Sequence, residues 1–105
     1  KHGRVLRGWL GALVVTTNAG VYVDGVVLKS SVHKAGLKSG DKVVELEGKK
    51  IEERMDMERA LEDKKPGETV SLVIERDGRV TTRRQTYKIV LGEEPVGAEI
   101  PPGLL

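Results

Sequence analysis

Branched aliphatic residues occur in this 105-residue chain as short blocks separated by glycine, and this pattern most narrows the folds open to it. Blocks of this kind, bounded by turn-forming residues, are typical of β-strands rather than of long helices. They predict strands over residues 10–17, 22–29, 42–47, 69–76 and 79–91. In one of these, Val70, Leu72 and Ile74 occupy every second position, which indicates a strand with one buried face.

Two segments have the pattern of helices. Residues 31–36 begin with serine and end with glycine, which predicts one or two helical turns. Residues 52–64 have acidic residues at the start and lysines at the end, and Pro66-Gly67 follows, which predicts a longer helix. The apolar stripe of that helix consists of Met57, Ala60 and Leu61. The opposite charges at a spacing of four are Arg54 with Glu58 and Arg59 with Asp63.

Two dipeptides predict tight turns, and the order of elements then indicates the fold class. Asp77-Gly78 joins two predicted strands and is a strong signal for a short hairpin, and Glu47-Gly48 has the same character. The resulting order is strand, strand, short helix, strand, helix, hairpin. This order predicts a mainly β protein, a small and partly open antiparallel barrel of five or six strands with two helices.

The length and the distribution of proline predict the domain organisation. A chain of 105 residues is expected to form one domain. We place that domain at residues 1–92 and expect residues 93–105, which contain three of the four prolines, to form an extended tail. The chain starts at Lys1 without an initiator methionine, which indicates a piece of a longer protein or a trimmed terminus. No apolar run approaches the roughly 20 residues that span a bilayer, so we expect no membrane insertion.

Composition excludes several classes of function. The absence of cysteine rules out disulfides, thiolate nucleophiles and cysteine-based metal sites. The net charge of +2 comes from a balanced mixture of acids and bases, and only three residues are aromatic, which argues against nucleic-acid binding. One cluster of basic residues is expected to form the solvated face of the last predicted hairpin. It consists of Arg76, Arg79, Arg83 and Arg84.

The chain is rich in glutamate and lysine and poor in amide side chains. Glu and Lys together number 21, whereas Asn18 and Gln85 are the only amides. This bias is typical of proteins from heat-adapted organisms, although chance in a short chain would explain it as well.

The sequence offers no catalytic or metal-binding constellation. Its serines lack the Gly-x-Ser-x-Gly surroundings of a hydrolase nucleophile, and only His2 and His33 are available as bases. Two distant histidines without cysteine also lack the spacing of metal ligands. We therefore expect no enzymatic activity from these residues, no metal and no cofactor.

The segment around Gly8 and Gly11 is the best candidate for a binding site. Two glycines that flank Trp9-Leu10 directly before a strand allow successive backbone N–H groups to converge on an anion. If that strand has an open edge, a peptide could pair with it while its terminal carboxylate occupies the loop. The alternative is that the glycines only shape a turn and that Trp9 fills a surface groove.

Several motifs of this chain together resemble a PDZ domain. One is the entry Arg4-Val5-Leu6-Arg7-Gly8-Trp9-Leu10-Gly11, and another is Ala35-Gly36-Leu37-Lys38-Ser39-Gly40-Asp41. The second motif is typical of bacterial PDZ domains. The first resembles more narrowly the PDZ domains that follow the protease domain in the HtrA (Deg) family of serine proteases, although Trp9 stands where that family often has tyrosine. The resemblance extends from about Gly3 to Gly92.

The resemblance implies which residues would bind a peptide. It places Gly8, Trp9, Leu10 and Gly11 on the carboxylate-binding loop, with Arg7 as the basic residue before it. The strand that pairs with the ligand would consist of Ala12, Leu13, Val14 and Val15. Leu10 and Leu13 would point into the pocket for the last ligand side chain. The second wall of the groove would be the longer helix, with Arg54, Met55 and Glu58 facing the groove or its rim. For Met55, ordinary core filling is the alternative.

The resemblance also implies a function, with alternatives. We expect a peptide-binding module that recognises C-terminal or extended segments by strand addition, as the substrate-recognition or regulatory domain of an HtrA-type protease. The catalytic domain would lie outside this chain, and the location would be the cell envelope or periplasm, with membrane anchoring through the parent chain as one option. The alternatives are a PDZ domain of an intramembrane metalloprotease and a small nucleic-acid-binding barrel.

The last five residues suggest a ligand within the chain itself. Pro101-Pro102-Gly103-Leu104-Leu105 ends in a carboxylate after two apolar side chains, which is what such a groove should accept. We expect this tail to dock in the groove of a neighbouring molecule at high concentration. The alternative is a frayed terminus.

Overall fold

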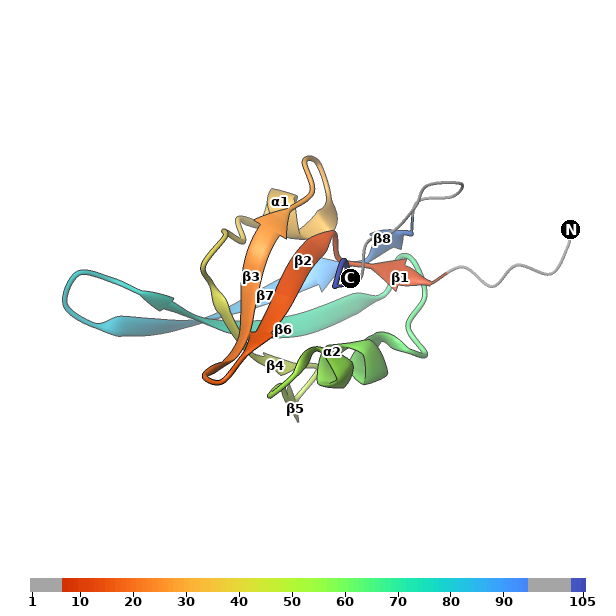
Figure 1. Cartoon of the computed structure of the whole chain (residues 1–105). Coiled ribbons are helices and arrows are strands. Elements are labelled where there is room, and N and C mark those ends of the chain that lie inside the picture. Colours follow the sequence, from red (N-terminus) through yellow and green to blue (C-terminus); the bar gives the residue numbers. More distant parts are fainter. Residues whose placement is uncertain (1–6, 95–102) are drawn as a thin grey trace, which may run out of the picture.

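The computed structural model describes residues 7–94 and 103–105, and its strands and helices follow the predicted order (Figure 1). The two helices are α1 (Ser31–Ala35) and α2 (Arg54–Leu61). The longer strands are β2 (Ala12–Thr17), β3 (Gly20–Val26), β4 (Lys42–Leu46), β6 (Thr69–Asp77) and β7 (Thr82–Val90). The two-residue strands are β1 (Gly8–Trp9), β5 (Lys49–Lys50) and β8 (Gly92–Glu93).

The strands form an open antiparallel sheet. The order of the main sheet is β2-β3-β4-β6-β7, with β5 paired to β4, and β1 and β8 form a separate two-stranded ladder. The sheet does not close into a complete barrel, and among the strands of this sheet β2 has a neighbour, β3, on one side only. In Figure 1 the β6–β7 hairpin runs across the molecule and projects beyond its body. The predicted mainly β fold with two helices and a partly open sheet is confirmed.

The core is built from aliphatic side chains, as the alternation predicts. Val70, Leu72 and Ile74 are at most 1% exposed, while the residues between them are only half-buried. The predicted helix stripe is also buried, and it consists of Met57, Ala60 and Leu61. Burial of these side chains is the main source of stability in a fold without disulfides.

The structure differs from the expected segments at several ends. The strand predicted from residue 10 begins at Ala12, because Gly11 has a left-handed φ of 88° that interrupts the extended backbone. The strand predicted to residue 29 ends at Val26, because Lys29 also has a positive φ and Ser30 caps α1. α2 ends at Leu61, and its Arg59 pairs with Asp56 at 3.6 Å. The predicted Arg59–Asp63 pair is therefore not the one formed.

One predicted tight turn is confirmed and the other is wider than expected. Glu47 and Gly48 both have positive φ, 52° and 76°, and reverse the chain between β4 and β5. Asp77-Gly78 does begin a hairpin, but the loop extends to residue 81 and β7 starts at Thr82. The wider loop is closed by Thr82 Oγ1, which donates to Asp77 Oδ1 at 2.8 Å, and by the Gly78 N–H, which donates to the Thr81 carbonyl at 2.8 Å.

Arg76 does not belong to a solvated basic face, which corrects the prediction for that cluster. Its guanidinium donates to both carboxylate oxygens of Asp41, at 2.8 and 2.7 Å, and Asp41 is only 2% exposed. The Tyr87 hydroxyl lies 3.2 Å from the same guanidinium. The hydrogen bonds to Asp41 raise the pKa of Arg76 above its ordinary value, so this ion pair holds β6 against the loop before β4.

The part of the chain that the structure describes contains neither a cluster of metal ligands nor a membrane-spanning helix. Within residues 7–94 and 103–105, histidine and carboxylate side chains do not gather in threes as a metal site would require. Neither helix of this part is long and apolar enough to cross a bilayer.

Candidate peptide-binding groove

The loop between β1 and β2 presents two backbone donors to one acceptor. The N–H groups of Leu10 and Gly11 both donate to the backbone oxygen of Leu105, at 2.8 and 3.2 Å. The loop at Gly8–Gly11, which the sequence predicts as an anion-binding turn, therefore has its donors directed at the last residue of the chain. Docking of the tail on a neighbouring molecule stays a prediction, because here the acceptor belongs to the same chain.

Residues Gly103, Leu104 and Leu105 extend the sheet as a short added strand. The Leu105 N–H donates to the Ala12 carbonyl at 2.8 Å, and the Val14 N–H donates to the Gly103 carbonyl at 2.8 Å. Leu13 and Leu104 form an antiparallel bridge between these bonds. Backbone pairing of this kind is the geometry by which an extended peptide adds to an open sheet edge.

Gly11 is fixed in place by a residue that the sequence analysis did not single out. A Cβ on Gly11 would overlap the Cβ and Oγ of Ser30, and its φ of 88° disfavours any other residue. Ser30 Oγ donates to the Gly11 carbonyl at 3.5 Å, and the Val27 N–H donates to the same carbonyl at 2.8 Å. The predicted short helix starts at Ser31, whereas Ser30 is the residue that caps α1, and a serine before a helix indicates only a cap.

Gly8 anchors the other end of the loop. Its N–H donates to the Lys64 carbonyl at 3.0 Å, and a Cβ there would overlap Leu91 Cδ1. The loop is therefore attached to α1 on one side and to the segment after α2 on the other. This attachment sets the positions of the two donors before any ligand arrives.

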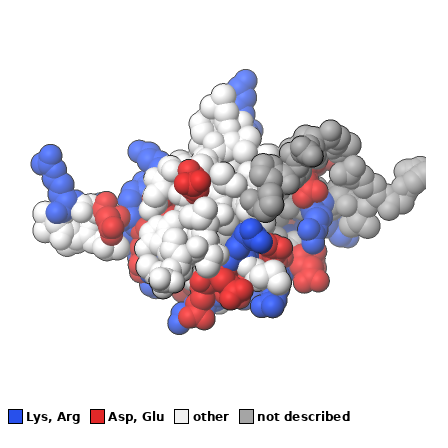
Figure 2. Space-filling model, viewed as in Figure 1, with Lys and Arg blue, Asp and Glu red and all other residues white. Residues whose placement is uncertain are grey.

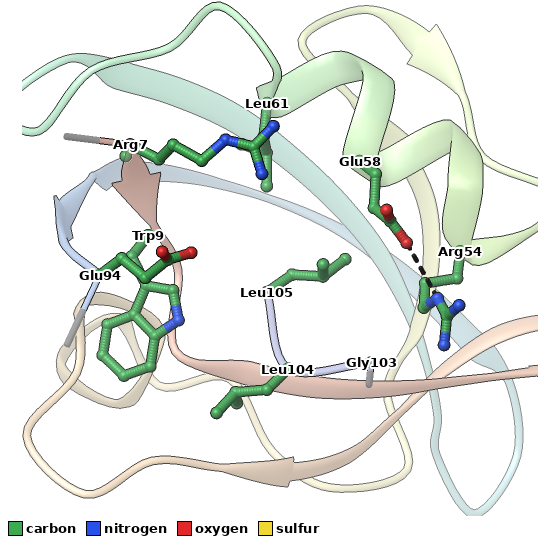
Figure 3. Close-up of a pocket in the computed structure, with 10 residues that line it drawn as sticks. Arg7, Trp9, Arg54, Glu58, Leu61, Glu94, Gly103, Leu104 and Leu105 are labelled. Carbon is green, nitrogen blue, oxygen red and sulfur yellow. Dashed lines mark hydrogen bonds and ion pairs between the residues drawn. The ribbon is translucent and has the colours of Figure 1, made fainter. Parts of the chain in front are cut away.

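The side chain of Leu105 is one wall of a cavity between the loop and α2. In Figure 3 it points toward α2, where Arg54 Nε donates to Glu58 Oε2 at 3.0 Å. The cavity has a volume of about 280 Å³. Its lining residues are Arg7, Gly8, Trp9, Arg54, Glu58, Leu61, Glu94, Gly103, Leu104 and Leu105. Leu61, which the sequence assigns to the helix core stripe, is thus also a wall of the cavity.

Most of the predicted groove residues come together here, but Leu13 does not have the expected orientation. Leu10 is fully buried in the core against which Leu105 packs. Leu13 lies in a different depression, with Leu104 and residues of β3. The prediction that Leu13 points into the pocket for the last side chain is wrong, because strand alternation from Ala12 directs Leu13 to the other face of β2. For Leu10, contact with the last ligand side chain stays a prediction.

Met55 and Val15 lie farther along the space between β2 and α2. They line a separate depression with Val14, Thr16 and Arg54, and they are 46% and 40% exposed. Such exposure excludes core filling for Met55. The Arg54 N–H donates to Thr16 Oγ1 at 3.0 Å, which fixes the start of α2 against β2. A contact of Met55 with ligand stays a prediction.

Comparisons with known proteins agree with this arrangement. A family model described as "PDZ domain" matches residues 8–84. A "Probable periplasmic serine endoprotease DegP-like" of Ectopseudomonas mendocina is 31% identical over 89% of this chain, and a "Serine protease Do-like HtrA" of Bacillus subtilis is 37% identical over 74%. Among solved structures, "HtrA-type protease AlgW with decapeptide" superposes with a TM-score of 0.75 and 27% identity, covering 90% of this chain and 31% of that one.

The matched region is only a part of those relatives. This chain spans 21% of the first curated relative and 18% of the second. The predicted resemblance to the PDZ domains of HtrA proteases is confirmed at the level of this module. With a loop that directs two N–H donors at one acceptor, an edge of β2 that accepts an added segment, α2 opposite it and a family match over residues 8–84, the chain belongs to the PDZ domain family.

Proposed function

We propose that this domain binds the C-terminal or extended segment of a partner protein by strand addition to β2, with the ligand's last carboxylate at the Leu10 and Gly11 N–H groups. The single observation that supports it most is the pairing of Gly103–Leu105 with this edge. Those residues show which backbone contacts a bound peptide would form. Charge-assisted hydrogen bonds to a carboxylate contribute about 1.5–3 kcal/mol each, so the loop would favour a free terminus over an internal segment.

A titration with synthetic peptides tests this proposal. Peptides that end in two apolar residues should bind, and the same peptides with an amidated terminus should bind at least tenfold more weakly, because one charged acceptor is lost. Equal binding of the acid and amide forms would exclude carboxylate recognition at the loop. Failure of every peptide to bind a chain shortened to end at Pro102, in which Gly103–Leu105 no longer occupy the edge, would exclude the proposed function.

The nucleic-acid alternative is not favoured by the surface. On the described part of the face in Figure 2, acidic and basic side chains are interspersed. A nucleic-acid site needs a continuous basic area, and its binding weakens steeply with salt. Measurable, salt-dependent binding of a single-stranded oligonucleotide would support this alternative instead.

We propose further that the domain belongs to an HtrA-type serine protease of the cell envelope, with a role in substrate recognition, regulation or protein quality control. The names of the curated relatives, periplasmic and DegP-like in the first case, support this placement. A PDZ domain of an intramembrane metalloprotease is the alternative parent. Sequencing the adjoining coding region decides between them, because only the first parent has a trypsin-like catalytic domain before this module. The same sequence reveals any membrane anchor.

The tail has a proposed role of its own. Gly103–Leu105 would compete with partner peptides for the groove, within one molecule or between copies at high concentration. The domain boundary at Gly92 belongs to the same proposal, although β8 continues to Glu93. Of the predicted extended tail over residues 93–105, residues 95–102 lie outside the described residues. Sedimentation of the chain with and without its last five residues tests exchange between copies. Unchanged self-association would exclude it.

The glutamate- and lysine-rich composition supports a heat-adapted source for the protein. A thermal unfolding midpoint above about 90 °C would agree with this proposal, and one within the mesophilic range of about 45–65 °C would contradict it.

A further inference from the structure

The second-last residue of the docked segment has a binding surface of its own. Leu104 is bridged to Leu13, and residues directly opposite each other in an antiparallel pair direct their side chains to the same face. In Figure 3 the side chain of Leu104 points away from α2, while that of Leu105 points toward it. The two neighbouring leucines therefore lie on opposite sides of the added strand.

Beside Leu104, which forms one of its walls, lies a small apolar depression between β2 and β3. It has a volume of about 270 Å³ and is lined by Leu13, Gly25, Val26, Val27 and Leu104. All the side chains in this lining are aliphatic. Val27 is 36% exposed even with Leu104 in place, so part of the depression is open to water. Covering such a surface with an apolar side chain is favourable, whereas covering it with a charged one is not.

Gly25 is the residue that creates the depression. It pairs with Leu13 across the β2–β3 ladder, so a side chain at this position would lie on the same face as Leu13 and Leu104. The position does not require glycine for backbone reasons, because its φ is not in the left-handed region and a Cβ would meet only Leu13, at 3.9 Å. The missing side chain leaves room for the ligand.

We infer that the groove selects a large aliphatic residue at the second-last position of its ligand, through contact with Leu13, Gly25 and Val27. This inference rests on the proposed strand addition and extends it from the last residue to the last two. The ligand class is therefore a chain end with two consecutive apolar residues, of which the final one faces α2 and the preceding one faces β3.

The test uses the full chain and a peptide series that differs only at the second-last residue, with leucine, glycine or lysine there. Leucine is expected to bind about tenfold more tightly than glycine, and lysine no better than glycine. Competition from Gly103–Leu105 weakens all three peptides by the same factor, so the ratios of their dissociation constants are unaffected.

Two variants connect the preference to the depression. Gly25→Val fills it and should reduce the leucine preference to less than threefold, while the peptide with glycine retains most of its affinity. Val27→Asp should reverse the preference in favour of lysine. Val80→Asp is the matched control, because Val80 is 91% exposed at the tip of the β6–β7 hairpin, and it should leave all ratios unchanged.

The outcomes separate this inference from the proposed function. If no peptide binds, the strand-addition proposal fails. If all three peptides bind with equal affinity, strand addition stands and the selection of the second-last residue is overturned. A leucine preference that persists unchanged in Gly25→Val would also overturn the assignment to this depression.

Discussion

Gly11 and Ser30 lie so close together that a single added carbon on Gly11 would overlap the side chain of Ser30. Nineteen positions separate the two residues along the chain, and the contact joins the ligand-facing loop to the start of α1. The position of the two loop donors thus depends on a contact outside the groove.

Substitution of Gly11 should therefore abolish peptide binding and also reduce stability. Gly11→Val forces a β-branched residue to a φ of 88° and against Ser30, which is expected to cost at least about 1–2 kcal/mol. Peptide affinity should fall more than tenfold, measured by titration at a temperature where circular dichroism shows the variant folded. Full affinity in a folded variant would contradict the role of this loop.

A second substitution separates the two effects of Gly11. Gly11→Ala should destabilise the domain less when Ser30→Gly is also present, because the overlap is then removed while the unfavourable φ remains. Urea unfolding of the parent, the two single variants and the double variant gives the coupling free energy between positions 11 and 30. If the losses of stability in the two single variants add up to the loss in the double variant, the overlap with Ser30 does not contribute to the destabilisation by Gly11→Ala.

Shortening the chain to end at Pro102 should strengthen the binding of partner peptides. The removed residues occupy the Leu10, Gly11, Ala12 and Val14 backbone positions that a peptide would use. Affinity is expected to rise at least tenfold, because competition by a tethered segment acts at an effective concentration on the order of millimolar. Leu104→Asp in the full chain is a milder version of the same change, and unchanged affinity in both would contradict competition.

Asp41→Ala should be among the most destabilising substitutions. Asp41 is buried, holds the Arg76 guanidinium through two oxygens and accepts the Lys38 N–H at 2.9 Å. Removal of one partner leaves the other charge without compensation, which costs about 3 kcal/mol here, since the Arg76 side chain retains 29% exposure. Urea unfolding measures the change. Asp24→Ala, at an exposed position, is the control and should change stability by less than about 0.5 kcal/mol.

Glu47 should make stability depend on pH in the acid range. The hydrogen bond from the Ser71 N–H at 2.7 Å, with help from Lys64, holds the pKa of Glu47 below its ordinary value. Because the pKa of Glu47 in the folded state lies below its unfolded-state pKa of about 4.3, the ionised carboxylate stabilises the domain at pH values above about 4.3. This contribution is lost as the pH falls through the folded-state pKa of Glu47.

Glu47→Gln tests that contribution. The variant should be about 1 kcal/mol less stable than the parent at pH 7, and the difference should shrink toward zero near pH 2. Glu62→Gln, at an exposed helix end, should show little difference at either pH. A difference for Glu47→Gln that does not change with pH would exclude the charged hydrogen bond as its cause.

Local patterns predicted the elements well, and long-range contacts account for what they missed. Alternation identified the buried face of β6, and Glu47-Gly48 identified its turn, because both depend on neighbours in the sequence. The Arg76–Asp41 pair joins residues 35 positions apart, so no local pattern distinguishes Arg76 from the exposed arginines after it.

The candidate groove could be predicted from its motif but not in its details. The glycines around Trp9-Leu10 indicated a donor loop, and the structure directs the Leu10 and Gly11 N–H groups to one acceptor. Leu13 lies on the face of β2 opposite to that of Ala12 and Val14, because side chains alternate along a strand. The sequence does not fix this alternation relative to Leu10, because Gly11 interrupts the extended backbone between them. The contribution of Leu61 depends on how α2 packs against β2, and helix periodicity alone does not fix that rotation.

The added strand at β2 would set the affinity range in which the groove works. Because its donors already hold a segment of the same molecule, every partner chain end would bind more weakly by one constant factor, and weak ends would leave the groove largely unoccupied by partners. Only ligands with better-fitting final residues, or many ends displayed together on one damaged protein, would displace it. The affinity of the groove for partner peptides would thus depend on how strongly Gly103–Leu105 compete, without any change to the residues that line the groove.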